Sequence, residues 1–252
     1  MKTISFSNMK GGVGKTSLSA TLAAELAKQA DTLLIDCDHQ ASASGWFAPE
    51  TISAELSDFL FEKKALEEVI AETSTKGLFI IPSFGLGGEL KVFAETQAGQ
   101  KHNCMKKVIR GAGALGYRYC VIDMHPDFGS LERAALIASD EVIVPVMPDA
   151  FAVSGLEIFS DNLKKLREDE ETQKPYFSRI IINGIDGRIK LHASVIEKMK
   201  NAAEDIFTFY QIPVDPCFRA AQDTGVAIQT LTSVKKETLD EIKRLCKDIK
   251  ES

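Results

Sequence analysis

Residues 2–17, KTISFSNMKGGVGKTS, constrain the fold of this chain more than any other stretch. A short β-prone run stops at a glycine-rich loop, and glycine lets the backbone fold closely around phosphate oxygens. Lys15 adds a point charge, the hydroxyl of Thr16 can reach a magnesium ion, and the following helix directs its first N–H groups at the same anion. The stretch predicts a nucleotide phosphate site formed by Lys10, Gly11, Gly12, Val13, Gly14, Lys15, Thr16 and Ser17.

The loop departs from the general P-loop pattern at one position. That pattern has glycine five residues before Gly14, where this chain has Met9. The string KGGVGKT, which begins at Lys10, resembles instead the deviant Walker A motif of the ParA/MinD family of ATPases, in which a signature lysine stands at this position. The resemblance implies that the chain binds ATP and Mg²⁺ and that Lys10 and Lys15 act in catalysis. It also implies a homodimer in the ATP state, in which each Lys10 reaches the nucleotide of the other subunit.

Two carboxylates follow the second predicted strand. Residues 32–35 precede Asp36, Cys37 and Asp38, and open α/β sheets place their ligands at the carboxyl ends of parallel strands. Asp36 and Asp38 point to the same side if the strand continues. The family usually reads D-x-D-P-Q here, which implies that Asp38 positions the attacking water and that Asp36 contributes to the metal site. His39 replaces the proline of that pattern, and a helix cap or turn is the alternative role for the two acids.

A further acid closes a strand predicted over residues 119–123. Four β-prone residues before Asp123 are a weak signal alone, and the order of P-loop, D-x-D segment and this strand gives them weight. By resemblance Asp123 is the Walker B acid, which meets Mg²⁺ through water because this ion keeps much of its hydration shell. The family commonly continues with two prolines and a small residue, whereas this chain has His125, Pro126 and Asp127. The segment after Asp123 therefore differs from the family pattern.

The histidines and cysteines near these strands do not predict a metal cluster. His39, His125, Cys37 and Cys120 all lie close in sequence to the acidic strand ends. Alternation directs Cys37 away from the face of the D-x-D acids, and no C-x-x-C or H-x₃-H spacing is present. Five cysteines without such a pair indicate free thiols in a reducing compartment.

Composition and length favour one cytoplasmic domain. The 252 residues are 44% apolar and no linker or repeat divides them, so residues 1–252 are predicted to form a single domain. The apolar run at the N-terminus is too short for a secretory signal, and no window has the length of a membrane span. A net charge of −6 argues against a surface that coats nucleic acid, although a local basic patch is compatible with it.

Segments of strand and helix character alternate from end to end. This alternation predicts one doubly wound α/β domain, a P-loop NTPase fold with a mainly parallel sheet flanked by helices on both faces. The predicted strands span residues 3–7, 32–35, 78–81, 119–123, 141–146 and 180–183. The predicted helices span residues 16–29, 105–115, 131–138, 151–171, 190–207 and 231–249, with two short helices between 44 and 72.

The last predicted helix raises the question of a membrane anchor, because MinD-type relatives attach through an amphipathic tail. Residues 231–249 carry apolar side chains at helical spacing. They also mix lysines with acids and contain no aromatic residue. This pattern favours a helix that docks on the fold, and a membrane partner is not expected.

Five further residues follow from the resemblance. Asn183 and Pro213 correspond to family positions near the base of the nucleotide, and a strand-end asparagine that holds a loop is the alternative for the first. Arg188, Lys190 and Arg219 fall near positions where relatives carry basic residues that contact DNA. Solvated surface charge is the alternative for these three.

These features favour an ATP hydrolase that works as a dimerising switch. The leading hypothesis is ParA-type partition of plasmid or chromosome DNA. In it the ATP dimer binds nucleoid DNA without sequence preference, and a ParB-like adaptor stimulates slow, Mg²⁺-dependent hydrolysis. The alternative is a MinD-like or cargo-positioning ATPase that acts through a protein partner or a membrane surface without DNA.

Overall fold

One twisted sheet forms the centre of the molecule. The computed structural model describes residues 1–251, and within them eight strands lie in the order β3-β4-β2-β5-β1-β6-β7-β8. All neighbouring pairs are parallel except β3 with β4. This arrangement confirms the predicted doubly wound α/β fold. The strands are β1 Lys2–Phe6, β2 Thr32–Cys37, β3 Ala71–Glu72, β4 Leu78–Ile81, β5 Tyr119–Met124, β6 Glu141–Val146, β7 Tyr176–Ile185 and β8 Thr208–Pro213.

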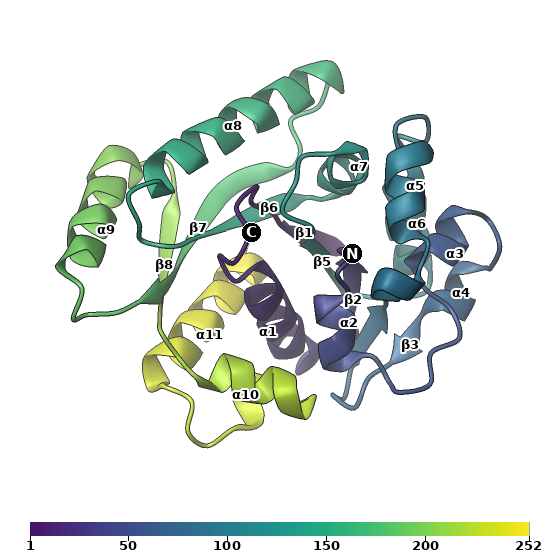
Figure 1. The fold of residues 1–252 in the computed structure, drawn as a ribbon, viewed down its shortest axis with the longest axis horizontal. Coiled ribbons are helices and arrows are strands. Elements are labelled where there is room, and N and C mark those ends of the chain that lie inside the picture. Colours follow the sequence, from purple (N-terminus) through teal and green to yellow (C-terminus); the bar gives the residue numbers. More distant parts are fainter. Residues whose placement is uncertain (252) are drawn as a thin grey trace.

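Helices cover both faces of this sheet (Figure 1). One face packs against α3 to α9, and the other packs against α1, α2, α10 and α11. The helices are α1 Lys15–Ala27, α2 Ser42–Phe47, α3 Leu56–Leu60, α4 Leu66–Val69, α5 Leu90–Thr96, α6 Cys104–Ala114, α7 Ser130–Ala138, α8 Ala152–Asp169, α9 Lys190–Ala203, α10 Cys217–Thr224 and α11 Lys236–Glu251.

The central strands read as continuous apolar runs because both of their faces are buried. In β2, Leu33 and Ile35 contribute to the core beneath α3 to α9, whereas Leu34 contributes to the core beneath α1 and α11. Strand periodicity places Asp36 on the side of Leu34 and Cys37 on the side of Ile35. The predicted separation of Cys37 from the acidic face is therefore confirmed.

Several predicted boundaries were wrong at the carboxyl-terminal half of the sheet. The strand predicted over 180–183 extends over Tyr176–Ile185, and the helix predicted to reach residue 207 ends at Ala203. Phe207 instead packs against Phe177 with the two rings tilted and their centroids 4.5 Å apart. Packing of this aromatic residue at the start of β8 outweighs helix continuation. The strands β3 and β8 and the helices α2, α5 and α10 were not predicted.

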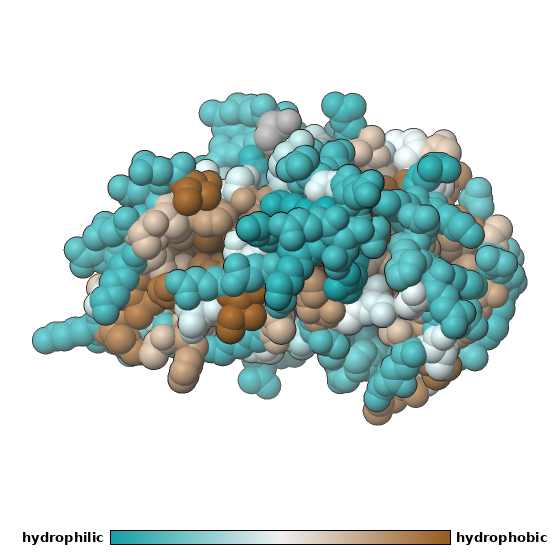
Figure 2. Space-filling view, turned by 90° about the horizontal axis from the view of Figure 1, so that it is seen from above, coloured by the Kyte–Doolittle hydropathy of each residue, from teal (hydrophilic) through white to brown (hydrophobic). Residues whose placement is uncertain are grey.

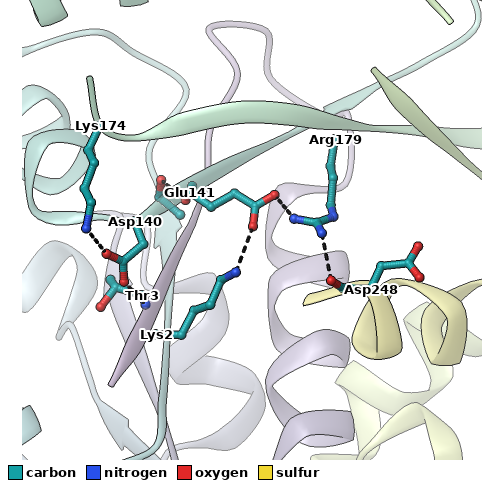
Figure 3. A network of polar contacts seen from close by, with 8 residues as sticks. Lys2, Thr3, Asp140, Glu141, Lys174, Arg179 and Asp248 are labelled. Carbon is teal, nitrogen blue, oxygen red and sulfur yellow. Dashed lines mark hydrogen bonds and ion pairs between the residues drawn. The ribbon is translucent and has the colours of Figure 1, made fainter. Parts of the chain in front are cut away.

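A polar network closes the amino-terminal end of the sheet, opposite the P-loop (Figure 3). The buried Glu141 accepts a hydrogen bond from Arg179, and its carboxylate lies 3.7 Å from the ammonium of Lys2. Arg179 also donates to the backbone carbonyl of Asp248 in α11, at 2.8 Å. The Asp248 carboxylate accepts from Tyr210, at 2.6 Å. These bonds attach the last helix directly to β7 and β8, and through Arg179 to Glu141 in β6, which agrees with the predicted docking helix.

The surface is largely polar with local apolar patches. Figure 2 looks down on the side where α8 lies uppermost in Figure 1, and its brown and tan residues gather toward the half that holds α9. Exposed apolar side chains in α8, α9 and the flanking loops include Phe151, Ile158, Leu191 and Ile206. Among residues 1–251, no helix combines the length and apolar character needed to cross a bilayer.

Candidate functional site

The predicted acids and the P-loop meet at the carboxyl ends of three neighbouring strands. Strand β5 lies between β1 and β2, and its register pairs Asp123 with Phe6 on one side and with Asp36 on the other. Phe6 is the last residue of β1 before the loop that leads to α1. The structure thus brings residues 8–16, Asp36 and Asp123 together, at the sheet edge where doubly wound folds bind ligands.

The P-loop backbone adopts the conformation that its glycines permit. Gly12 and Gly14 have positive φ angles of 74° and 91°, a region that side chains with a Cβ atom rarely occupy. A Cβ atom added at Gly11 or Gly12 would meet no atom within 4 Å. The outer side of the loop is therefore open, and α1 begins immediately afterwards at Lys15. An anion can approach both the loop amides and the helix N-terminus.

Lys15 points inward from the first turn of α1. Its side chain is buried, and its ammonium donates to the backbone carbonyl of Lys10, at 3.2 Å. Burial lowers the pKa of Lys15. The nearby charges of Asp123 and Asp38 act in the opposite direction and only partly offset this effect. A phosphate would stabilise the charged form further, because it places negative charge beside a poorly solvated ammonium.

Asp123 is the clearest sign that a cation belongs in this site. It is fully buried, and neither carboxylate oxygen has a hydrogen-bond partner of good geometry among residues 1–251. Burial raises the pKa of Asp123 to about 8, helped by the charge of Asp36 and opposed by the hydroxyls of Thr16 and Ser19. A buried carboxylate beside hydroxyl oxygens is the kind of oxygen-rich site that suits Mg²⁺.

Asp36 is tied more firmly into the fold. One of its oxygens accepts from the Asp38 N–H, at 3.2 Å. The other accepts from the N–H and the hydroxyl of Ser44, at 2.7 and 2.6 Å. Burial raises the pKa of Asp36 to about 6, and the Ser44 hydrogen bonds oppose this rise. Asp36 therefore has two roles: it orients α2 through Ser44, and it lies beside Asp123.

Asp38 is held by groups from the loops that follow two neighbouring strands, β2 and β5. Its Oδ1 accepts from the Gln40 N–H, at 2.8 Å, and lies 2.8 Å from Nδ1 of His125. The rings of His39 and His125 have centroids 4.1 Å apart. Burial lowers the pKa of His39, and the neighbouring His125 adds to this effect.

This grouping of Asp38, His39 and His125 was not found from the sequence. As metal ligands, the two histidines were considered there only together with Cys37 and Cys120. Both of these cysteines are buried, and burial raises the pKa of each thiol. The available signal was that both histidines stand next to acidic strand ends, but its use requires knowing that β2 and β5 are neighbours.

Lys10 lies outside its own phosphate loop. Its side chain is about half exposed and forms an ion pair with Asp149, which follows β6. The backbone N–H of Lys10 donates to Asn8, at 2.9 Å, and the amide of Asn8 donates to the Pro145 carbonyl, at 2.7 Å. The loop is thus braced against β6, while the ammonium of Lys10 faces outward.

Asn183 contacts the P-loop from β7. Its amide donates to the Val13 carbonyl, at 3.0 Å, and a Cβ atom added at Gly14 would clash with the same amide nitrogen. Pro213 ends β8 and pairs in register with Ile185, at the end of β7. Both predicted base-site residues therefore lie at strand ends on the P-loop side of the sheet, and Asn183 also holds the loop.

Comparison with known proteins places these observations in a family. The sequence model of a family described as an AAA domain matches residues 1–175. The chromosome-partitioning ATPase Soj of Treponema pallidum is 30% identical over 200 residues, which cover 79% of this chain and 77% of that protein. The chain belongs to the ParA/MinD family of ATPases.

Solved structures agree with this assignment. A plasmid partition protein from Borrelia burgdorferi superposes on this ParA/MinD chain with a TM-score of 0.74 and 25% identity, over 98% of both chains. An ATP complex of an McdA variant from Cyanothece gives a TM-score of 0.83 at 19% identity, over 100% of this chain and 95% of that one. The second likeness concerns the fold alone.

The basic residues predicted to contact DNA lie on separate elements of this ParA/MinD fold. Arg188 lies in the loop between β7 and α9, Lys190 is the first residue of α9, and Arg219 lies in α10; Figure 1 shows α9 and α10 apart from each other. Arg188 forms hydrogen bonds with the Asp186 carboxylate, which lower the pKa of that acid. Arg219 lies 3.9 Å from Asp223. Both arginines are highly exposed, and each has a carboxylate close to it.

Proposed function

We propose that this chain is an ATP-dependent dimerising switch that acts in ParA-type partition of plasmid or chromosome DNA. One observation carries the proposal: Lys10 is exposed at the outer edge of a P-loop whose inner side already holds Lys15 and Asp123. A lysine so placed can exchange its ion pair with Asp149 for a contact with a nucleotide bound by a second copy. The proposal implies that the ATP state is a homodimer. The partition relatives named above support it.

The binding roles follow from where each side chain lies. Lys15 and the loop amides of residues 10–17 would hold the phosphates, and Asn183 and Pro213 would border the base. Thr16, Asp36 and Asp123 would hold Mg²⁺, which when bound supplies positive charge against the charge that spreads over the γ-phosphate. Asp38, fixed by its contacts with Gln40 and His125, would orient the attacking water.

The first test concerns Lys10. We expect Lys10→Ala to retain ATP binding by the monomer but to lose ATP-driven dimerisation, because Lys15 remains in the phosphate site while the group that reaches the second subunit is gone. Light scattering with and without ATP measures the dimer fraction, and a fluorescent ATP analogue measures binding. Lys76→Ala, an exposed lysine just before β4, is the matched control. A normal dimer yield from Lys10→Ala would contradict the proposal.

The second test concerns DNA. We expect a salt-sensitive complex with random duplex DNA that forms only with ATP. The triple substitution of Arg188, Lys190 and Arg219 by alanine should weaken it and lower the slope of log affinity against log salt by about 3, roughly one per phosphate contact. A control of equal charge loss is available in α6, where Lys106, Lys107 and Arg110 are exposed. If the α6 control weakens binding equally, these three residues do not form the DNA surface.

A ParB-like adaptor is the partner that this function requires. Slow hydrolysis by the purified chain should increase when the DNA-binding adaptor of the same partition system is added, and Asp38→Ala should remove both rates. Hydrolysis that is fast without any partner would count against a partner-timed switch.

One observation favours a second candidate, a cargo-positioning ATPase that works through a protein partner without DNA. Asp186 and Asp223 stand beside two of the three predicted DNA contacts and reduce their net positive charge. Normal ATP-driven dimerisation without any DNA complex at low salt would favour this candidate. The same experiment thus separates the two functions.

A further inference from the structure

Two histidines from separate loops converge on Asp38. The register of β2 with β5 pairs Cys37 with Met124, so Asp38 and His125 leave neighbouring strands at the same level. Nδ1 of His125 lies 2.8 Å from Oδ1 of Asp38. One ligand atom from each of Asp38, His39 and His125 lies within 4.8 Å of the other two.

We propose that Asp38, His39 and His125 bind a divalent transition-metal ion of the Zn²⁺ class, and that this ion inhibits ATP hydrolysis by occupying the Asp38 carboxylate. Two imidazole nitrogens with one carboxylate oxygen suit Zn²⁺ or Co²⁺, whereas Mg²⁺ prefers oxygen ligands alone. The inhibitory half rests on the proposed function, in which Asp38 orients the attacking water. The binding half does not.

The observed separations lie close to those of a three-ligand site. Bonds of about 2.0–2.2 Å in tetrahedral geometry place ligand atoms roughly 3.3 Å apart. The 2.8 Å pair must open slightly, and the widest separation, within 4.8 Å, must shorten. His39 and His125 follow the ends of strands and are partly exposed, so side-chain rotation can supply these shifts and one side of the ion stays open to water.

The surroundings favour a cation. Glu132 is almost completely buried, and its carboxyl interacts electrostatically with both His125 and Asp38. Asp127, in the loop after β5, interacts electrostatically with Glu132. On the α5 side, Lys91 and Glu95 both act on His39 with opposite signs. Burial raises the pKa of Glu132, and a cation bound at the cluster would stabilise the charged form of this acid. Lys15, which interacts electrostatically with Asp38, is the opposing positive charge.

Metal binding is tested first, on the full chain without nucleotide. Co²⁺ is added alone and its visible absorption is recorded, and Zn²⁺ is then added to displace it and is also followed by calorimetry. We expect one ion per chain. His39→Gln and His125→Gln should each weaken binding by about tenfold or more. The chain has four histidines, so His102→Gln and His192→Gln are matched controls that should bind as the unsubstituted chain does.

Inhibition is tested second, with Mg²⁺ in large excess so that the P-loop cation site is filled. Micromolar Zn²⁺ should reduce ATP turnover, and a chelator should restore it. His39→Gln should make turnover resistant to Zn²⁺, whereas His102→Gln should stay sensitive. Inhibition that persists in His39→Gln would place the inhibitory ion elsewhere and overturn this role.

The outcomes separate this inference from the proposed function. Absence of Co²⁺ and Zn²⁺ binding, or binding that neither His39→Gln nor His125→Gln weakens, overturns the metal site whatever the ATPase activity. Binding that follows the two histidines while the chain hydrolyses no ATP at all supports the site and contradicts the proposed function. Binding with unchanged turnover overturns the inhibitory role alone.

Discussion

At the scale of single residues, the candidate site places two buried carboxyl groups next to each other, where negative charge is unfavourable. Asp36 and Asp123 are register partners on neighbouring strands, and both are completely buried. Burial raises both pKa values, to about 6 and about 8. Without a cation the fold therefore keeps a proton on this pair near neutral pH, and a bound divalent ion would displace it.

This arrangement predicts a pH-dependent gain in stability from Asp123→Asn. The folded pKa of about 8 exceeds the unfolded value of 3.8, so the folded state holds a proton that the unfolded chain loses. Stability from Asp123 is thus complete below about pH 4 and declines as pH rises toward 8. Thermal unfolding without nucleotide or Mg²⁺ should show that Asp123→Asn raises Tm by several degrees more at pH 8 than at pH 5.

A control for this prediction is Asp205→Asn, because Asp205 is exposed and should shift Tm equally at both pH values. If the gain from Asp123→Asn is the same at pH 5 and pH 8, the buried carboxyl does not carry the proton assigned to it.

The residues of the site differ in how far the sequence could predict them. Asp36, Asp38 and Asp123 follow apolar runs, and strand ends are recognisable without knowing the strand order. The contact between Asp38 and His125 joins residues 87 apart. It depends on the insertion of β5 between β1 and β2, which is a property of the topology. Local pattern therefore identified the acids and could not identify the histidines that contact them.

At the scale of elements, the longer helices were predicted well, whereas several short elements were missed. The helices α6, α7 and α8 were predicted to within a few residues because each spans two or more turns with one buried side. In contrast, α10 is eight residues long and begins where Asp215 accepts from the Cys217 N–H, at 3.0 Å. The same acid accepts from Lys235 and Thr238. Such an element is stabilised by contacts from distant residues, which no local periodicity reveals.

The docked position of α11 leads to a prediction about stability. Leu245 is buried against the core that α1 and α11 share, so Leu245→Ala should reduce the free energy of unfolding by about 2–5 kcal/mol. Lys247→Ala, on the exposed side of the same helix, should change it by less than about 0.5 kcal/mol. Urea unfolding followed by circular dichroism measures both. Equal stability of the two variants would mean that α11 is a detachable tail.

At the scale of the whole molecule, one sheet separates two apolar cores and belongs to both. Strand β5 contributes Cys120 and Ile122 to the core beneath α3 to α9 and Val121 to the core beneath α1 and α11. Unfolding either layer exposes one face of the shared strands to water. The two layers therefore stabilise each other. If residues 1–252 form the predicted single domain, both layers should unfold together.

We accordingly expect residues 1–252 to unfold in one cooperative transition. Trp46 is the only tryptophan, and its indole N–H donates to the Val226 carbonyl, at 2.9 Å and 180 residues away. Its fluorescence therefore reports on the layer of α2 and α10. A second reporter, Phe207→Trp in a Trp46→Phe background, reports on the layer of α8 and α9. In each reporter protein, fluorescence and circular dichroism should give the same urea midpoint, and the two proteins should share one midpoint if they are equally stable. A fluorescence midpoint that differs from the circular dichroism midpoint of the same protein would show that the layers unfold as separate units.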